Sequence, residues 1–167
     1  MASPTLTPAL FPNEVVFATN SAPLTGTGPS YPGRGFNVAK VTLTSAQILA
    51  LETGAITLLP APGTGLWIAP SRIMINMKAG SAAYTDAGGA VSFSMGSMTA
   101  ALGANTVFTA AANDTNHQVF DFAATATAAA PATNENAAMT ISKATNNFAA
   151  GNGTCSIVIE FTIQDSI

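Results

Sequence analysis

Charge is what this sequence has least of. Only 8% of its 167 residues are Asp, Glu, Lys or Arg, whereas an ordinary soluble domain has roughly 25%. The five basic residues are too few and too scattered to neutralise a run of phosphates, so we expect no nucleic-acid partner. The net charge of −3 is also too small for charge-driven disorder. A surface with so little charge favours self-association, which predicts an oligomer or a place inside a larger assembly.

Cysteine and long apolar runs are scarce too. Cys155 is the single cysteine, so no internal disulfide can form and the chain is not a secreted disulfide scaffold. It lies in the apolar run 155–159, which predicts a small buried residue in a strand. No apolar run approaches the roughly 18 residues that span a bilayer, and the first residues lack the pattern of a signal peptide. We therefore expect no membrane partner and no secretory leader.

Groups that could carry chemistry are isolated from one another. His117 is the only histidine, and nothing nearby in the sequence ties it to Cys155 as a catalytic pair. The oxygen-rich stretch Asn113–His117 lacks the glycine and the final Glu of a calcium loop, so a hairpin turn is the simpler interpretation. There is no Gly-x-Ser-x-Gly elbow and no complete phosphate loop. The sequence thus predicts a protein that is not an enzyme, with no catalytic residues, no metal site and no cofactor.

Proline is concentrated at the N-terminus, where six of the ten prolines precede residue 33. Such a segment cannot sustain a helix, yet it is too apolar for a solvated linker. We predict that residues 1–36 form an extended arm that lies on its own domain, on a sister subunit or on a partner lattice. The apolar residues expected to make that contact are Leu6, Leu10, Phe11, Val15, Val16, Phe17 and Leu24.

From residue 37 onward the pattern is one of short alternating runs separated by turn residues. Strands are predicted at 38–43, 55–59, 66–68, 72–78, 91–95, 106–109, 118–122, 138–142 and 155–164. Pro70 indicates a sheet edge or a bulge. One short helix is predicted over 44–51, where Thr44 and Gln47 can form a capping box. The Ala/Thr tract 123–133 is interpreted as an extended loop, because threonines and Pro131 oppose a helix.

This pattern predicts an all-β chain. We expect residues 37–167 to form one antiparallel β-sandwich domain with a jelly-roll-like winding, one short helix and the proline-rich arm in front of it. Barrels have similar short strands and turns, so they are the nearest alternative architecture.

One part of the sequence resembles a known group of proteins. The stretch 40–51, followed by Thr57–Gly63 and by Gly80–Thr85, is similar to tailed-phage virion proteins. They share a strand, a Ser-x-x-Ile-Leu-x-Leu helix, a second strand with a Pro-x-Pro-Gly turn, and a later x-Ala-Tyr segment. The resemblance covers residues 40–95, about a third of the chain. It is closest to capsid decoration (cement) proteins, which are small β-rich modules, often trimers.

The resemblance implies a structural protein on the outer surface of a phage head. Its partners would be the major capsid protein lattice and its own copies, most simply in a homotrimer. The alternative is a phage tail or fibre module that binds a host surface glycan. In that case Trp67 and Tyr84 are the candidate surface contacts, because an aromatic ring can stack on a sugar. An enzyme of the sandwich class is the third and least supported interpretation.

Overall fold

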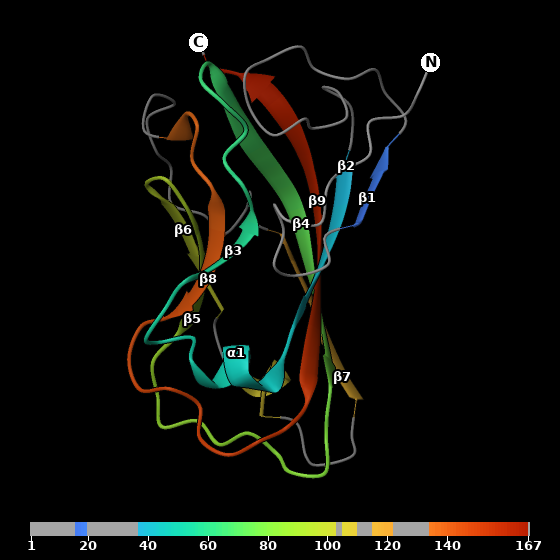
Figure 1. The fold of residues 1–167 in the computed structure, drawn as a ribbon, viewed down its shortest axis with the longest axis vertical. Coiled ribbons are helices and arrows are strands. Elements are labelled where there is room, and N and C mark those ends of the chain that lie inside the picture. The colour runs from blue at the N-terminus through green and yellow to red at the C-terminus, as the bar shows by residue number, and fades with distance from the viewer. Residues whose placement is uncertain (1–15, 20–36, 103–104, 110–114, 122–133, 167) are drawn as a thin grey trace.

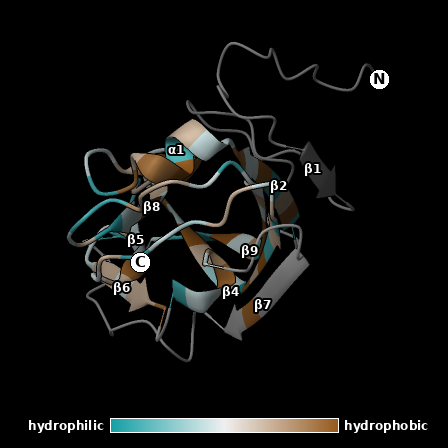
Figure 2. Ribbon diagram, turned by 90° about the horizontal axis from the view of Figure 1, so that it is seen from below, coloured by the Kyte–Doolittle hydropathy of each residue, from teal (hydrophilic) through white to brown (hydrophobic). Residues whose placement is uncertain are grey.

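The computed structural model describes residues 16–19, 37–102, 105–109, 115–121 and 134–166. Within these residues the chain forms two antiparallel β-sheets and a single short α-helix, so the predicted all-β class is confirmed. The two sheets lie on opposite sides of the molecule in the end-on view of Figure 2. The five-stranded sheet has the order β1-β2-β9-β4-β7, with β1 (Val16–Thr19), β2 (Asn37–Leu43), β9 (Thr154–Asp165), β4 (Leu66–Lys78) and β7 (Thr115–Asp121). The four-stranded sheet has the order β3-β8-β5-β6, with β3 (Ile56–Leu59), β8 (Met139–Lys143), β5 (Val91–Met95) and β6 (Met98–Ala101).

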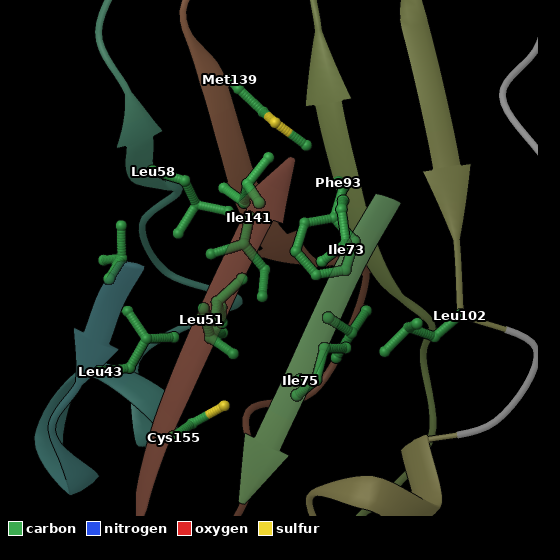
Figure 3. Close-up of a cluster of buried hydrophobic side chains, with 14 of the residues drawn as sticks. Leu43, Leu51, Leu58, Ile73, Ile75, Phe93, Leu102, Met139, Ile141 and Cys155 are labelled. Carbon is green, nitrogen blue, oxygen red and sulfur yellow. The ribbon is translucent and has the colours of Figure 1, made fainter. Parts of the chain in front are cut away.

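The core lies between the sheets because alternate residues of each strand face inward. In β9 the odd-numbered residues from Cys155 to Ile163 are at most 1% exposed, as the alternation of the sequence predicts. Leucine, isoleucine, methionine and phenylalanine side chains from both sheets meet between them (Figure 3). Burying each of these large side chains contributes roughly 1.5–3 kcal/mol. This core holds the two sheets together.

The long strand β4 contains the irregularity expected at Pro70. Its register with β9 shifts between Pro70 and Arg72, so Ser71 is the additional residue. The Ser71 hydroxyl donates to the carbonyl of Glu160 at 3.1 Å. Proline has no N–H to donate to a ladder, and a bulge accommodates it. The bulge prediction is confirmed, and among the described residues Pro70 pairs only with β9, because the pairing of β4 with β7 begins at Arg72.

The short helix α1 (Ser45–Leu49) closes the lower end of the space between the sheets in Figure 1. Its N-cap is Thr44, and the predicted capping box is present. The backbone N–H of Gln47 donates to the Thr44 hydroxyl at 3.3 Å, and the Thr44 N–H donates to the Gln47 side chain at 2.9 Å. Two backbone donors that the helix cannot satisfy itself are therefore satisfied. Ile48 is fully buried and anchors the helix to the core.

Two local predictions are wrong. The strand predicted at 106–109 is instead the 3-10 helix η2 (Asn105–Val107). Val107 and Phe108 are adjacent and both buried, which a strand with two different faces does not allow. The turn predicted at Asn113–His117 is also wrong for residues 115–117, because β7 already begins at Thr115.

The four residues of β1 belong to the segment predicted as an arm, and they pair antiparallel with β2. Val16 lies opposite Lys40 and Thr19 lies opposite Asn37. At these residues the chain runs along the edge of its own five-stranded sheet. The Ala/Thr tract 123–133 lies outside the described residues. The other predicted contact residues of the arm lie outside them too: Leu6, Leu10, Phe11, Val15 and Leu24.

Candidate functional site

The most concentrated polar chemistry in the described residues surrounds Lys143 at the end of β8. Met139, Ile141 and Lys143 share the inward face of this strand, so the lysine side chain enters the core and has 0% exposure. A buried ammonium group is costly unless charge and hydrogen bonds compensate it. Asp86 supplies the charge, with its Oδ1 atom 3.0 Å from the lysine Nζ.

Backbone oxygens complete the surroundings of the ammonium group. Its Nζ donates to the carbonyls of Thr145 at 2.9 Å and Asn146 at 2.6 Å, and to the carbonyl of Gly88. The φ angle of Gly88 is 102°, a conformation that glycine adopts at little cost, and this turn brings its carbonyl to the lysine. The Phe148 ring centroid lies 5.0 Å from Nζ, within the range of a cation–π contact. Every N–H of the ammonium therefore has an acceptor.

Asn105 extends this network to the 3-10 helix. Its Nδ2 atom donates to Asp86 Oδ2 and to the carbonyl of Gly89, both at 2.7 Å, and its Oδ1 accepts from the Val91 N–H at 3.1 Å. Burial acts to raise the pKa of Asp86. The hydrogen bonds from Asn105, Lys143 and Gly88, with the lysine charge, outweigh burial and lower that pKa below its ordinary value. This arrangement ties three separate segments together, and we interpret it as structural.

Two other candidate reactive groups, Cys155 and His117, lie in strands of the five-stranded sheet. The Cys155 thiol is fully buried, and burial raises its pKa to about 12, so it is protonated at neutral pH and a poor nucleophile. This confirms the predicted buried cysteine. His117 lies in β7 opposite Asn76 of β4. Among the described residues, no three His, Cys, Asp or Glu side chains are grouped so that they could hold a metal ion.

The structure corrects one candidate aromatic contact and places the other. Tyr84 is 3% exposed, and its hydroxyl donates to the Gly153 carbonyl at 2.8 Å. Burial, with a smaller contribution from Cys155, raises the pKa of its hydroxyl. The expected surface contact at Tyr84 is therefore wrong, because its ring packs against Phe148 and Gly151 inside the protein. Trp67 lies on β4 opposite Gln164, half-buried and packed against the core.

Sequence analysis did not identify the network of Lys143, Asp86 and Asn105. One signal for it was available, because the alternation from Met139 to Lys143 puts a lysine at an inward position. A lysine at such a position requires an acidic partner within reach of its ammonium group. Nothing in the sequence indicated that this partner is Asp86, which lies 57 positions earlier in the chain (143 − 86).

Comparison with known proteins adds no family assignment. No protein-family model, no curated protein and no solved structure matches the chain. Within the described residues, no helix is long and apolar enough to cross a membrane.

Proposed function

We propose that this protein is a structural component of a phage virion, a capsid decoration protein that binds the outer surface of the head and stabilises its lattice. The strand order is the observation that carries the proposal. The described residues contain eight strands from β2 to β9. Counted in chain order, the first, eighth, third and sixth lie side by side in one sheet, and the second, seventh, fourth and fifth lie side by side in the other. We infer a jelly-roll winding from this order. Jelly rolls occur in viral capsid domains, and also in lectins and cupins.

Architecture alone does not assign a function, so the surfaces and reactive groups have to support it. The Cys155 thiol and the Lys143 amine are both buried and engaged in packing or in hydrogen bonds. The resemblance of residues 40–95 to tailed-phage virion proteins points to assembly. The low charge of the chain and its apolar, proline-rich N-terminal segment point the same way.

The glycan-binding alternative draws less support from the described residues. It needs exposed aromatic rings, and Tyr84 is buried while Trp67 is half-buried.

The expected partners are the major capsid protein lattice and further copies of this chain, with a homotrimer as the simplest assembly. Among the described strands, β1 and β7 end the five-stranded sheet. Such edges are commonly covered by a neighbour, which an oligomer would provide.

The test is the location and copy number of the protein in purified particles. Heads and tails are separated, and the protein is quantified in each by mass spectrometry against the major head and tail proteins. We expect it on the heads, in many copies per particle, and as an oligomer in sedimentation experiments on the free protein. Recovery with the tails in a few copies would favour the glycan-binding module, and absence from particles would refute both.

A further inference from the structure

The outer faces of the two sheets differ in chemistry. On the four-stranded sheet, one row across the strands consists of Thr57, Thr140, Ser94 and Thr99, paired in register. The next row along begins with Ser142 and Ser92 and ends at Ala101. All these side chains are small and uncharged, so this face offers neither charge nor large apolar groups to a partner.

The outer face of the five-stranded sheet carries the positive charge. Lys40, Arg72 and Lys78 are exposed there, each next to at least one buried core residue of its own strand. The fourth lysine or arginine of the described chain, Lys143, is buried with Asp86. Every exposed basic side chain that the structure describes therefore lies on one face. This clustering is notable because the chain as a whole has a net charge of −3.

These cations surround apolar side chains. A row across four strands runs from Lys40 through Val158 and Met74 to Val119. Val158 and Met74 are half-buried by their neighbours, while Val119 on the edge strand β7 is 59% exposed. Among the described residues, Val119 is the one large apolar residue whose side chain is exposed. An apolar centre with charged residues at its rim is the usual composition of a protein–protein interface.

The charge of this face is only partly neutralised. Arg72 and Glu160 form a loose ion pair at 3.7 Å, with the arginine side chain 57% exposed. Pairs of this kind contribute little to stability. Among the described residues, Lys40 and Lys78 have no ion-pair partner. Two cations are thus available for acidic groups on another molecule.

We propose that the outer face of strands β2, β9, β4 and β7 docks on an acidic, partly apolar protein surface. This inference rests on the proposed function, in which that surface belongs to the head lattice. Charge complementarity identifies the partner, since Lys40 and Lys78 would meet carboxylates while Met74, Val119 and Val158 cover apolar groups. Nucleic acid fits less well, because three dispersed cations with Glu160 among them give few phosphate contacts.

Two double variants with the same change in net charge test the proposal. Lys40→Gln/Lys78→Gln removes two positive charges from the proposed face. Thr57→Glu/Thr99→Glu adds two negative charges to the outer face of the other sheet, at two exposed positions. Binding of each purified variant to heads that lack this protein is measured by co-sedimentation at two salt concentrations. A third variant, Val119→Asp, tests the apolar contact.

We expect the lysine variant to bind roughly tenfold more weakly, with a smaller salt dependence than the wild type. The threonine variant should bind like the wild type, and Val119→Asp should bind more weakly at both salt concentrations. All changes are at exposed positions, and thermal unfolding checks that each variant is folded.

If wild type and all variants bind heads equally, the docking face is refuted while the proposed function stands. If the wild type does not bind heads, the proposed function fails and this inference fails with it. Lysine-dependent binding to DNA fragments instead of heads would replace the protein partner by nucleic acid.

Discussion

At the scale of single residues, the buried ammonium of Lys143 is the strongest determinant of local structure. Its acceptors come from the loop before β5 and from the turn after β8, and Asn105 connects the same loop to the 3-10 helix. A charge inside the core organises its surroundings because an unsatisfied partner there is costly. The loops at this end of the sandwich are therefore held by one polar network as well as by apolar packing.

Removing the Asp86 carboxylate should show how strongly the stability of the fold depends on the Lys143 network. Asp86→Asn leaves the ammonium buried without its counter-charge, and we expect the free energy of unfolding to fall by about 3 kcal/mol. The double variant Asp86→Asn/Lys143→Met removes the charge as well, so it should lose less than the sum of the single variants. Urea unfolding measures Asp86→Asn, Lys143→Met and the double variant, with Glu52→Gln at an exposed position as the control. Additive losses would show that the two groups act independently.

The same carboxylate predicts an acid dependence of stability. The pKa of Asp86 is lowered in the folded protein relative to its ordinary value of 3.8. Its stabilising contribution is therefore complete above pH 3.8 and is lost as the pH falls below that value through the folded-state pKa. Melting temperatures of wild type and Asp86→Asn between pH 2 and pH 6 should converge at the acid end. A difference that does not change with pH would contradict this assignment.

Gly151 should tolerate no side chain. Its φ angle is 85°, and an added Cβ would overlap the Tyr84 ring. Gly151→Ala should therefore lower the free energy of unfolding by about 2 kcal/mol or more, from left-handed backbone strain and lost packing of the tyrosine. Gly65→Ala is the matched control, because the φ angle of Gly65 is also positive, at 76°, and no atom lies within 4 Å of its added Cβ. Similar unfolding curves for the two variants would show that the tyrosine moves away freely.

At the scale of elements, alternation in the sequence predicted the central strands well. The patterns of β2, β5, β8 and β9 place apolar residues on one face, and burial follows that pattern. The prediction missed β6, although Gly96 and Ser97 between Met95 and Met98 are a typical two-residue hairpin turn. It also misjudged residues 106–109, where a 3-10 turn begins at Asn105, whose side chain is hydrogen-bonded to Gly89 and Val91 from an earlier part of the sequence.

Polar sites were less predictable than strands for a physical reason. A strand is encoded by neighbours two residues apart, whereas the Lys143 network joins residues that the sandwich brings together only after folding. The docking face likewise depends on register, since Lys40, Val158 and Met74 come from three strands. Periodicity gives the face of each residue, but the order of the strands decides which residues are neighbours.

The helix provides a prediction at this scale. Thr44→Ala removes the hydroxyl that caps α1, and we expect it to lower the free energy of unfolding by about 1 kcal/mol. Thr44→Ser keeps the hydroxyl and should lose much less. Chemical denaturation of both variants measures the difference. An equal effect of alanine and serine would mean that the methyl group of Thr44, rather than its hydrogen bond, is what matters.

At the scale of the whole molecule, the described core is drawn from both sheets of the sandwich. The N-terminal segment contributes β1 as an edge strand of the five-stranded sheet, next to the proposed docking face. The N-terminal segment therefore meets the body at the edge of the surface that we expect to bind the lattice.

Two truncations distinguish the roles of this segment. Deleting residues 2–30 removes β1 and all seven predicted arm contacts, whereas deleting residues 2–13 keeps β1 and removes only Leu6, Leu10 and Phe11. We expect both proteins to retain a folded β-rich body, because the buried apolar residues of the described sandwich, drawn from both sheets, remain in each. The longer deletion should no longer decorate heads, since apolar side chains worth roughly 1.5–3 kcal/mol each are lost from every subunit. Circular dichroism and head co-sedimentation measure the two properties. Full occupancy by the longer truncation would refute the arm as an anchor, and its failure to fold would show that β1 belongs to the body.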